Sequence, residues 1–309
     1  MISVLVASRN RPEQIVRCLR VIGEGAKAAV GEVIVVDQSD PPYEGLAGAL
    51  GDTVPLRHVV SDKVGVSRAR NLGVACARHE VVAVTDDDCV VDTGWASRIE
   101  ARFEAEPSLD ALCGRILPYG AGRPGAEPVS VRPSTVACRL PRFGDPARYG
   151  SGNNLAFRKA AFDAVGGYDE AIGPGTDILA GEDSELLFRL LRSGHAVSYD
   201  PEVLVHHDAW RPETEMLGLI SSYSFGSAAY LAREVVMRGD PAAGAILAER
   251  LLRPLAQWLF NLAVQRPERR MAAQQRLTGS AAGLWAVLTC DAGRGITRQW
   301  LRARRREEA

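Results

Sequence analysis

The feature that most constrains the fold of this chain is an alternation, through its first half, of short apolar runs and helical patterns. The apolar runs are rich in β-branched residues, as strands buried on both faces of a parallel sheet are. They cover Ile2–Ala7, Glu32–Val36, Leu56–Val60 and Val81–Val84. Helical patterns lie between them, over Pro12–Ile22, where proline takes a first-turn position, and over Val66–Ala77. This alternation predicts an α/β fold with an open, mostly parallel sheet flanked by helices.

The rest of the chain is less regular. A third helix is expected from a cap at Thr93 to about Ala105, before Pro107. Residues 118–150 are rich in Pro, Gly and Arg, which predicts a long loop over the site. Further expected elements are a helix that opens at Gly181-Glu182-Asp183 and ends at Gly194, a short strand pair over Ala196–Tyr199 and Val203–His207, and helices beyond Pro212. We therefore expect a catalytic domain over residues 1–211 and a helical C-terminal region over 212–309.

Composition and charge exclude several classes of protein. At 46% apolar and 24% charged residues, the 309-residue chain is typical of folded globular proteins. From residue 212 onward there are 14 Arg against 9 Asp and Glu, whereas the first 211 residues carry a net charge of −6, which argues against nucleic-acid binding. The six cysteines contain no C-x-x-C pair and indicate reduced thiols in a cytoplasmic protein. The start of the chain resembles a buried strand rather than a signal peptide, and the longest uncharged run, Met216–Ala232, is shorter than the ~20 apolar residues that a spanning helix needs.

Polar clusters directly follow three of the predicted strands. They are Ser8-Arg9-Asn10, Asp37-Gln38-Ser39-Asp40 and Thr85-Asp86-Asp87-Asp88. Ligands bind to open parallel sheets beyond the carboxyl ends of the strands. The three clusters are therefore expected to converge on one edge, where they would form the site.

The three aspartates are the most informative cluster. Adjacent carboxylates repel one another unless a positive group lies nearby, and hard oxygen ligands suit Mg²⁺ or Mn²⁺. In an extended segment, Asp86 and Asp88 would point to one side and Asp87 to the other, so that the first and third could hold a ribose and a metal. The alternative is a solvated acidic turn, which the two neighbouring polar clusters make less favourable.

Three further groups could take part in chemistry. Glu182 and Asp183 open a helix, where one could be a cap and the other a general base. Strand alternation puts His207 on the face of Val203 and Val205, as a structural hydrogen-bonding group or a metal ligand, and His206 on the other face. Arg70-Asn71 could point towards a base or diphosphate, whereas Arg68 is expected on the helix surface. No G-x-G-x-x-G or P-loop fingerprint is present, which counts against dinucleotide and ATP binding.

The order of these motifs resembles that of family 2 glycosyltransferases of the GT-A fold, over about residues 1–211. The matching segments are Val6–Arg11, Val33–Asp40, Gly65–Asn71, Thr85–Cys89 and Gly181–Asp183, and Ser151–Arg158 resembles a stretch that lines the sugar pocket. Gln38-Ser39-Asp40 departs from the commoner Asn-Gly-Ser, which leaves base selectivity open.

The resemblance implies roles for individual residues. Asp183 would be the catalytic base with Glu182 beside it, and Asp88 and His207 would bind Mn²⁺ or Mg²⁺. Asp86 would lie near the ribose and Arg70 near the base or diphosphate. Asp37 would accept a hydrogen bond from the base. The expected nucleotide-sugar-binding residues are Ala7, Ser8, Arg9, Asp37, Arg70, Asn71, Asp86, Asp87 and Asn154.

The implied reaction is a metal-dependent, inverting transfer of a sugar from a nucleoside-diphosphate sugar, with a UDP-sugar favoured, to a hydroxyl of a glycan, lipid-linked or small-molecule acceptor. Two alternatives stay open. A sugar nucleotidyltransferase would need a basic loop near the amino terminus, where only Arg9 and Arg11 lie, and a non-catalytic sugar-nucleotide-binding protein need not keep both Asp88 and Asp183.

The C-terminal helices allow two interpretations. They are a helical cap or a homodimer surface, or they attach the protein peripherally to the anionic inner face of the cell membrane, close to a lipid-linked acceptor. The second interpretation rests on apolar stretches flanked by arginines, among them Arg266, Arg269, Arg270 and a cluster of Arg302, Arg304, Arg305 and Arg306.

Overall fold

The computed structural model describes residues 1–25, 29–51 and 54–289, which divide into two units. The first unit contains Met1–Asp169 and Leu186–Arg211, and the second contains Glu170–Glu185 and the residues from Pro212 onward. Residues 170–185 thus group with the C-terminal helices, whereas the sequence placed them with the first 211 residues. Cys290 and the cluster from Arg302 to Arg306 lie outside the described residues.

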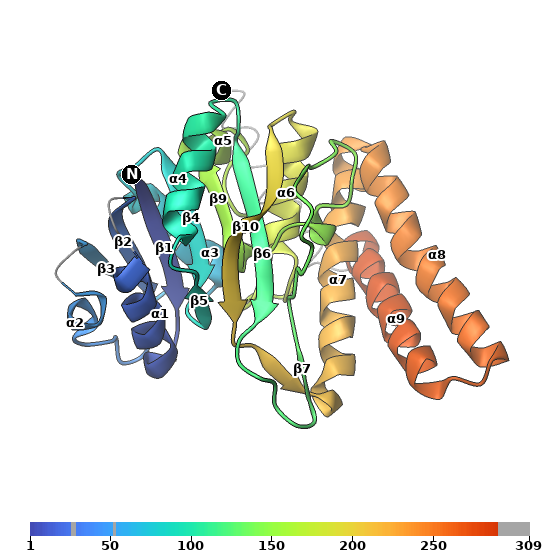
Figure 1. The fold of residues 1–309 in the computed structure, drawn as a ribbon. Helices are drawn as coiled ribbons and strands as arrows, with labels where there is room; N and C mark the ends of the chain where they lie inside the picture. The colour runs from blue at the N-terminus through green and yellow to red at the C-terminus, as the bar shows by residue number, and fades with distance from the viewer. Residues whose placement is uncertain (26–28, 52–53, 290–309) are drawn as a thin grey trace. The chain divides into compact units, whose positions relative to one another are not determined.

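The first unit is built on a sheet of nine strands within the described residues, with the order β3-β2-β1-β4-β9-β6-β10-β5 and β8 paired to β10 (Figure 1). The pairs β1–β2, β1–β4, β2–β3 and β6–β10 are parallel, whereas β9 runs antiparallel to β4 and β6. The predicted α/β fold with a mostly parallel sheet is confirmed. The strands are β1 (Ile2–Ser8), β2 (Val30–Asp37), β3 (Leu56–Val60), β4 (Val81–Asp86), β5 (Cys89–Val91), β6 (Ala111–Pro118), β8 (Cys138–Arg139), β9 (Leu155–Arg158) and β10 (Val197–His207).

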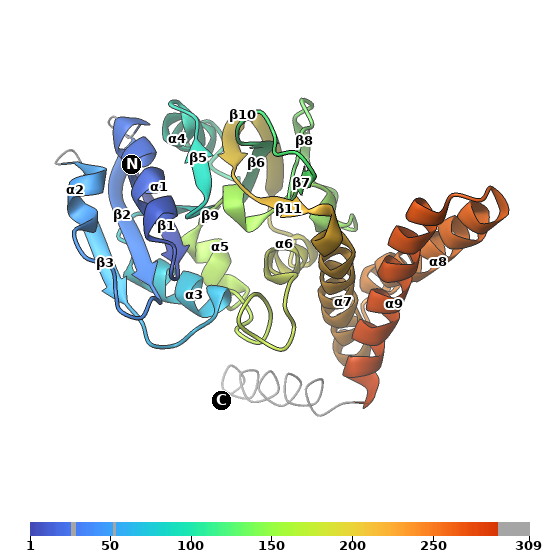
Figure 2. The ribbon, with the colours of Figure 1, turned by 90° about the horizontal axis from the view of Figure 1, so that it is seen from below.

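Helices cover both faces of this sheet, which explains why its strands are apolar at successive positions. Alternate residues of β1 enter different cores: Val4 and Val6 lie in one, and Leu5 lies in the other. The first core lies under α1 (Pro12–Gly25), α2 (Leu46–Leu50) and α4 (Trp95–Ala105). The second lies under α3 (Val66–Cys76), α5 (Lys159–Ala164) and the later residues of α6 (Glu182–Arg192). Figure 2 shows these two helical layers on opposite sides of the sheet.

Three predicted details of the first unit are wrong. Thr93 does not cap α4, because the N-cap is Gly94, and the Asp92 carboxylate accepts a hydrogen bond from the Gly94 amide. The expected strand pair is a single strand, β10, which continues past an irregularity after Asp200 because β6 pairs with it on both sides.

The third detail is the loop over residues 118–150, which contains regular structure. It includes β7 (Ala126–Pro128), β8 and a 3₁₀ turn at Pro146–Arg148. β7 pairs with β11 (Trp210–Pro212), and β8 pairs with β10, so backbone pairing between distant segments orders a stretch whose composition indicates no element.

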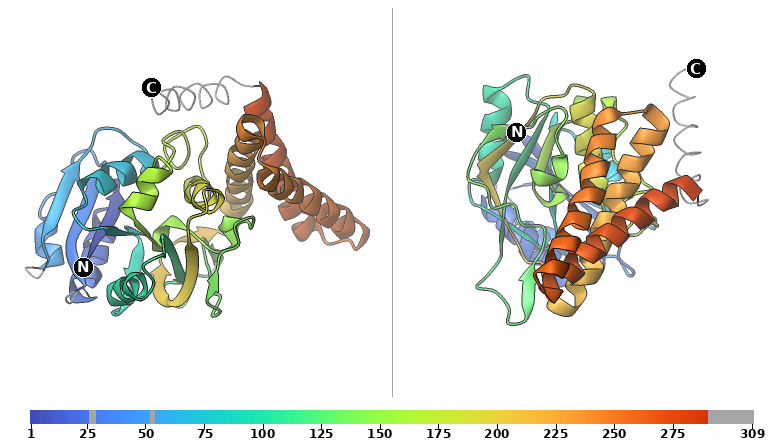
Figure 3. Two further views of the ribbon diagram at one scale, coloured as in Figure 1. Left: turned by 90° about the horizontal axis from the view of Figure 1, so that it is seen from above. Right: turned by 90° about the vertical axis from the view of Figure 1, so that its right-hand side faces the viewer.

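The second unit consists of α7 (Glu213–Arg238), α8 (Pro241–Ala263) and α9 (Pro267–Thr289), which pack against one another, together with residues 170–185 (Figure 3). Gly226 of α7 lets the backbone of this segment come close, since a Cβ at that position would lie 1.9 Å from the carbonyl oxygen of Ala180. A buried ion pair of 2.9 Å joins Arg233 of α7 to Glu185. No described helix is both long enough and apolar enough to cross a membrane.

Candidate active site

The polar clusters that follow β1, β2 and β4 converge on one edge of the sheet, as predicted. These three strands are neighbours and run parallel, so that Ser8 pairs with Asp37 and Ala7 pairs with Asp86. The Ser8 hydroxyl donates a hydrogen bond of 2.6 Å to Asp87. Asn10 accepts one from the amide of Asp40 at 3.2 Å, which connects the first cluster to the second. Parallel pairing thus brings together segments that are up to 80 residues apart in the chain.

The three aspartates face two different cations. Asp86 ends β4 and pairs with Arg70 of α3 at 2.9 Å. Asp87 and Asp88 share a single guanidinium nitrogen of Arg11, at 3.0 and 2.9 Å. The predicted alternation, with Asp86 and Asp88 on one side and Asp87 on the other, is wrong because the chain turns at Asp87 and Asp88 before β5 begins. The turn brings Asp87 and Asp88 to a common partner.

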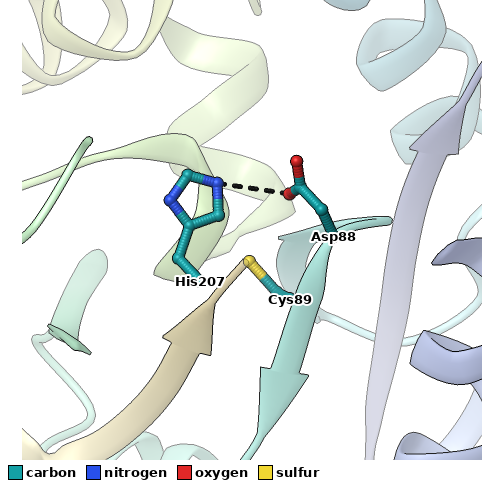
Figure 4. Close-up of side chains that lie close together, drawn as sticks. All are labelled: Asp88, Cys89 and His207. Atoms are coloured by element: carbon teal, nitrogen blue, oxygen red, sulfur yellow. Dashed lines mark ion pairs between the residues drawn. The ribbon is translucent and has the colours of Figure 1, made fainter. Parts of the chain in front are cut away.

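Asp88 also lies next to His207. The imidazole Nε2 of His207 is 3.2 Å from Asp88 Oδ1 (Figure 4). Its Nδ1 is 3.2 Å from the carbonyl oxygen of Val129. His207 is buried at the end of β10, whereas His206 is half-buried on the other face, so the predicted alternation is confirmed. The antiparallel pairing of β10 with β5 sets His207 opposite Cys89, whose thiol lies beside the other two groups.

Burial and charge act in opposite directions on these groups. Burial raises the pKa of Asp87 to about 6. Burial would also raise the pKa of Asp88, but His207 and Arg11 hold it below its ordinary value. Burial would lower the pKa of His207, but the Asp88 carboxylate raises it above its ordinary value. Asp88 is therefore the carboxylate of this turn that stays ionised most readily.

Asp88 and His207 fit a divalent cation. Asp88 Oδ1 is buried. Within the described residues it accepts no hydrogen bond of good geometry, although Nε2 of His207 lies 3.2 Å away. Two ligands at right angles, each about 2.1 Å from an ion, are about 3.0 Å apart, close to the separation observed here. Burial raises the pKa of the Cys89 thiol well above its ordinary value, and a protonated thiol is a poor ligand. The carboxylate and imidazole are therefore the two groups of this turn that could hold Mn²⁺ or Mg²⁺.

The predicted nucleotide-binding residues at this edge of the sheet differ in their burial and in the hydrogen bonds that they make within the protein. Asp37 is fully buried, accepts hydrogen bonds from the amides of Ser39 and Tyr43, and lies 3.0 Å from His58 Nε2. Burial would raise the pKa of Asp37, but these hydrogen bonds lower it. Ala7 is half-buried in β1, and Arg9 is exposed and makes no hydrogen bond or ion pair with the described residues.

Two predicted binding residues use their amides inside the fold. Asn71 bonds to the backbone amide and carbonyl of Tyr168, each at 2.9 Å. Asn154 donates to the carbonyl oxygens of Arg115 and Val203 and accepts from the indole of Trp95, all at 2.9 Å. The structure does not bring either side chain into contact with the aspartates.

Glu182 and Asp183, the predicted catalytic pair, open α6 in the second unit. Glu182 is buried and Asp183 is half-buried, and together with Glu185 they place three acids in the first helical turn, where the helix dipole favours negative charge. The helix then continues into the first unit at Leu186, so one element contributes to both units. The roles of the pair in catalysis stay predictions.

Sequence reasoning missed two contributors to the site, Arg11 and Tyr43. The Tyr43 hydroxyl lies 3.0 Å from Ser8 Oγ and accepts a hydrogen bond from the Arg11 amide at 2.7 Å. A signal for Arg11 did exist, because a cation just beyond the end of β1 comes close to the acids that end β4. Tyr43 lies in an irregular segment, where no periodicity indicates its direction.

The fold is that of the GT-A glycosyltransferases. The profile of Glycosyl transferase family 2 matches residues 3–166, just over half of the chain, and the chain belongs to this family.

Two characterised relatives share part of the sequence. A glucosyl-dolichyl phosphate glucuronosyltransferase from Haloferax volcanii is 27% identical over 195 residues, which are 61% of this chain and 62% of the relative. A pre-mycofactocin glycosyltransferase from Mycobacterium tuberculosis is 30% identical over 210 residues, 65% of this chain and 42% of the relative. The chain thus spans less than two thirds of either relative.

Solved structures share the fold. A mannosyltransferase from Pyrobaculum calidifontis, solved in complex with GDP-Man and Mn²⁺, has a TM-score of 0.60 at 16% identity and matches 92% of this chain and 87% of its own. GalNAc-T7, solved with UDP, GalNAc and Mn²⁺, has a TM-score of 0.52 at 16% identity. The match covers 77% of this chain and 51% of the GalNAc-T7 chain. At these identities the likeness concerns the fold alone.

Proposed function

We propose that this protein transfers a sugar, with inversion, from a nucleoside-diphosphate sugar to an acceptor hydroxyl, using a divalent cation held by Asp88 and His207. The observation that carries the proposal is the pair formed by Asp88 Oδ1 and His207 Nε2, buried and 3.2 Å apart, in which the carboxylate oxygen accepts no hydrogen bond from the described residues. The mannosyltransferase and GalNAc-T7 were both solved with Mn²⁺, which adds support from the same fold.

The donor would lie across the edge formed by β1, β2 and β4. Ser8 and Asp37 would hold the nucleoside, and Asp86, at the end of β4, would hold the ribose while Arg70 orients its carboxylate. Arg9, exposed at the end of β1, would attract the diphosphate. A bound Mn²⁺ or Mg²⁺ supplies Lewis-acid stabilisation of the negative charge that develops on the leaving diphosphate.

Asp183 would act as the general base. Asp183 is a half-buried carboxylate in the first turn of α6, and a carboxylate can accept the proton of the attacking hydroxyl. Base and leaving group would be on opposite faces of the sugar, which accounts for inversion. Glu182 would lie near the acceptor.

The nucleotide and the acceptor are proposed at the level of chemical class. We favour a UDP-sugar donor, and UDP and GDP-Man in the two structural relatives show that the fold accepts more than one base. The name of the Haloferax relative includes a dolichyl phosphate, which supports a lipid-linked acceptor over a free glycan or a small molecule. The cytoplasmic location and the homodimer that the sequence suggests stay predictions.

The proposal is tested by titration calorimetry with MnCl₂, with and without UDP, followed by a hydrolysis assay over a panel of sugar nucleotides. We expect Mn²⁺ to bind, UDP binding to require it, and one donor to be hydrolysed to nucleoside diphosphate and free sugar. Asp88→Asn should abolish Mn²⁺ binding, whereas His206→Gln, a change on the other face of β10, should leave it intact. A folded protein that binds neither Mn²⁺ nor any sugar nucleotide would refute the proposal. Conversion of a sugar nucleotide and added pyrophosphate to a nucleoside triphosphate and a sugar 1-phosphate would indicate a nucleotidyltransferase.

A further inference from the structure

The second half of α8 exposes an apolar face. Leu252, Leu255, Leu259 and Leu262 recur at steps of three and four residues, so they lie along one side of the helix, and they are 64%, 39%, 52% and 45% exposed. Phe260, next to this stripe, is 62% exposed, and Val264 follows directly after the helix. Large apolar patches on a protein surface mark a binding site for a protein or a membrane. We call these six side chains the α8 face.

Among the described residues of the second unit, α8 packs through a side other than the α8 face. The opposite side of the same helix is buried, through Ala243, Leu247, Pro254 and Asn261. The helix is therefore already anchored by one side. The second apolar side, which is exposed, is available for a further partner.

The charges around the α8 face identify the chemistry of that partner. Residues 241–289 contain six arginines and two glutamates. Arg253 is exposed on α8 and lies 3.5 Å from Glu249 on the same helix, and Arg266, Arg269 and Arg270 follow where α8 turns into α9. Within the described residues, the last three make no hydrogen bond or ion pair through their side chains. Apolar side chains bordered by three arginines that have no acidic partner in the described part of the chain match a surface that offers both hydrocarbon and negative charge.

We infer that the α8 face binds the surface of an anionic lipid membrane, with α8 lying in the plane of the interface. The leucines and Phe260 would enter the boundary between headgroups and acyl chains, and the arginines would contact lipid phosphates. A second copy of the chain is the less favoured occupant, because a symmetric contact between two such faces would bring like charges together. The inference is independent of the donor chemistry at Asp88.

The test is flotation of the 309-residue protein with vesicles of phosphatidylcholine alone and with vesicles that also contain 30% phosphatidylglycerol. We expect binding to the anionic vesicles and at least tenfold weaker binding to the neutral ones. NaCl at 0.5 M should release part of the bound protein, because salt screens the electrostatic attraction between arginines and lipids but not the apolar contacts. Leu259→Glu/Phe260→Glu should reduce binding to anionic vesicles at least tenfold. Val136→Glu, which changes an exposed valine in the first unit, is the matched control and should bind as the parent does.

Circular dichroism, the thermal midpoint and donor hydrolysis establish that the double variant is folded, since the altered side chains are more than half exposed. Failure of the parent protein to bind either vesicle, or equal binding by the parent and the double variant, would overturn the inference. So would light scattering that finds a dimer for the parent and a monomer for the double variant, because the α8 face would then bind a second copy. If the parent protein hydrolyses no donor, this result counts against the proposed function and leaves the membrane result unaffected.

Discussion

Asp88 divides its two carboxylate oxygens between two environments. Oδ2 lies 2.9 Å from Arg11, and Oδ1 faces His207. A cation at Oδ1 can therefore bind without displacing Arg11, but it needs a neutral imidazole, because a protonated His207 has no lone pair at Nε2. In the proposed site, a proton and the metal ion would compete for the same nitrogen.

This competition predicts that Mn²⁺ affinity falls as the pH is lowered. Asp88 raises the pKa of His207 above its ordinary value, so the imidazole keeps its proton to a higher pH than a free histidine does. Below that pKa, affinity should fall by about tenfold per pH unit, since each bound ion must displace one proton. Protonation of Asp87, whose pKa is raised to about 6 by burial, weakens cation binding in the same direction.

Calorimetry with MnCl₂ between pH 5.5 and 8.5 measures the slope. His207→Asn should bind Mn²⁺ weakly and with a much flatter pH dependence, whereas His206→Gln should keep the slope of the parent. An affinity that does not change across this range would show that His207 is not a ligand.

Asp183 is the residue on which turnover is predicted to depend. Asp183→Asn keeps the shape of the side chain but removes its capacity to accept a proton, so the rate should fall by about 10²–10⁴-fold while donor binding is retained. The steady-state rate and calorimetric UDP affinity separate the two effects. Asp177→Asn, the same change at an exposed position of segment 170–185, is the control and should have parental turnover. Turnover of Asp183→Asn within threefold of the parent would remove Asp183 from the mechanism.

At the level of elements, Asn154 connects three parts of the first unit. Its amide donates to carbonyl oxygens at residues 115 and 203, in β6 and β10, and accepts from the indole of Trp95 on α4. Gly114 leaves room for this arrangement, because a Cβ there would lie 2.2 Å from the Asn154 amide nitrogen. A side chain that the resemblance assigned to ligand binding thus serves the packing of β6, β10 and α4.

Asn154→Ala is therefore predicted to destabilise the fold. Three buried polar groups would lose their partner, and with about 1–3 kcal/mol for each unsatisfied group the free energy of unfolding should fall by roughly 3 kcal/mol or more. Urea denaturation measures this change, and Gly114→Ala should destabilise as well by displacing the same amide. If Asn154→Ala keeps parental stability and loses donor binding instead, the role in nucleotide-sugar binding is the correct one.

Across the whole molecule, the proposed roles divide between the two units. The cation and nucleotide residues belong to the first unit, and the proposed base belongs to segment 170–185 of the second. Within the second unit that segment is held by the close approach at Gly226 and by the buried pair of Glu185 with Arg233. α6 runs from one unit into the other.

Ligand binding at the first unit is predicted to raise the stability of the protein. A ligand that binds only the folded state at 100 times its dissociation constant stabilises it by about 2.7 kcal/mol, which for a domain of this size raises the thermal midpoint by several degrees. Mn²⁺ with UDP should therefore raise the midpoint in differential scanning calorimetry, and EDTA should reverse the increase. Asp88→Asn should show no increase, and a response to UDP that EDTA leaves unchanged would contradict the role of the cation.

Much of this architecture could be predicted from local patterns. Runs of β-branched residues and helical periodicity depend on neighbours within a few positions, so the strands β1 to β4 and helices α1 and α3 lie where they were expected. The convergence of Ser8, Asp37 and the aspartates also follows, because parallel strands end on the same side of their sheet. His207 was placed correctly by the period of two.

Features that depend on residues far apart in the chain became visible only in the folded protein. The partnership of Asp87 and Asp88 with Arg11, the use of the Asn71 and Asn154 amides within the fold, and the grouping of residues 170–185 with α7 all arise from contacts across tens of residues. Turns and long-range hydrogen bonds have no periodic signature in the sequence, because their geometry depends on which distant atoms come within about 3 Å of each other once the strands and helices have packed.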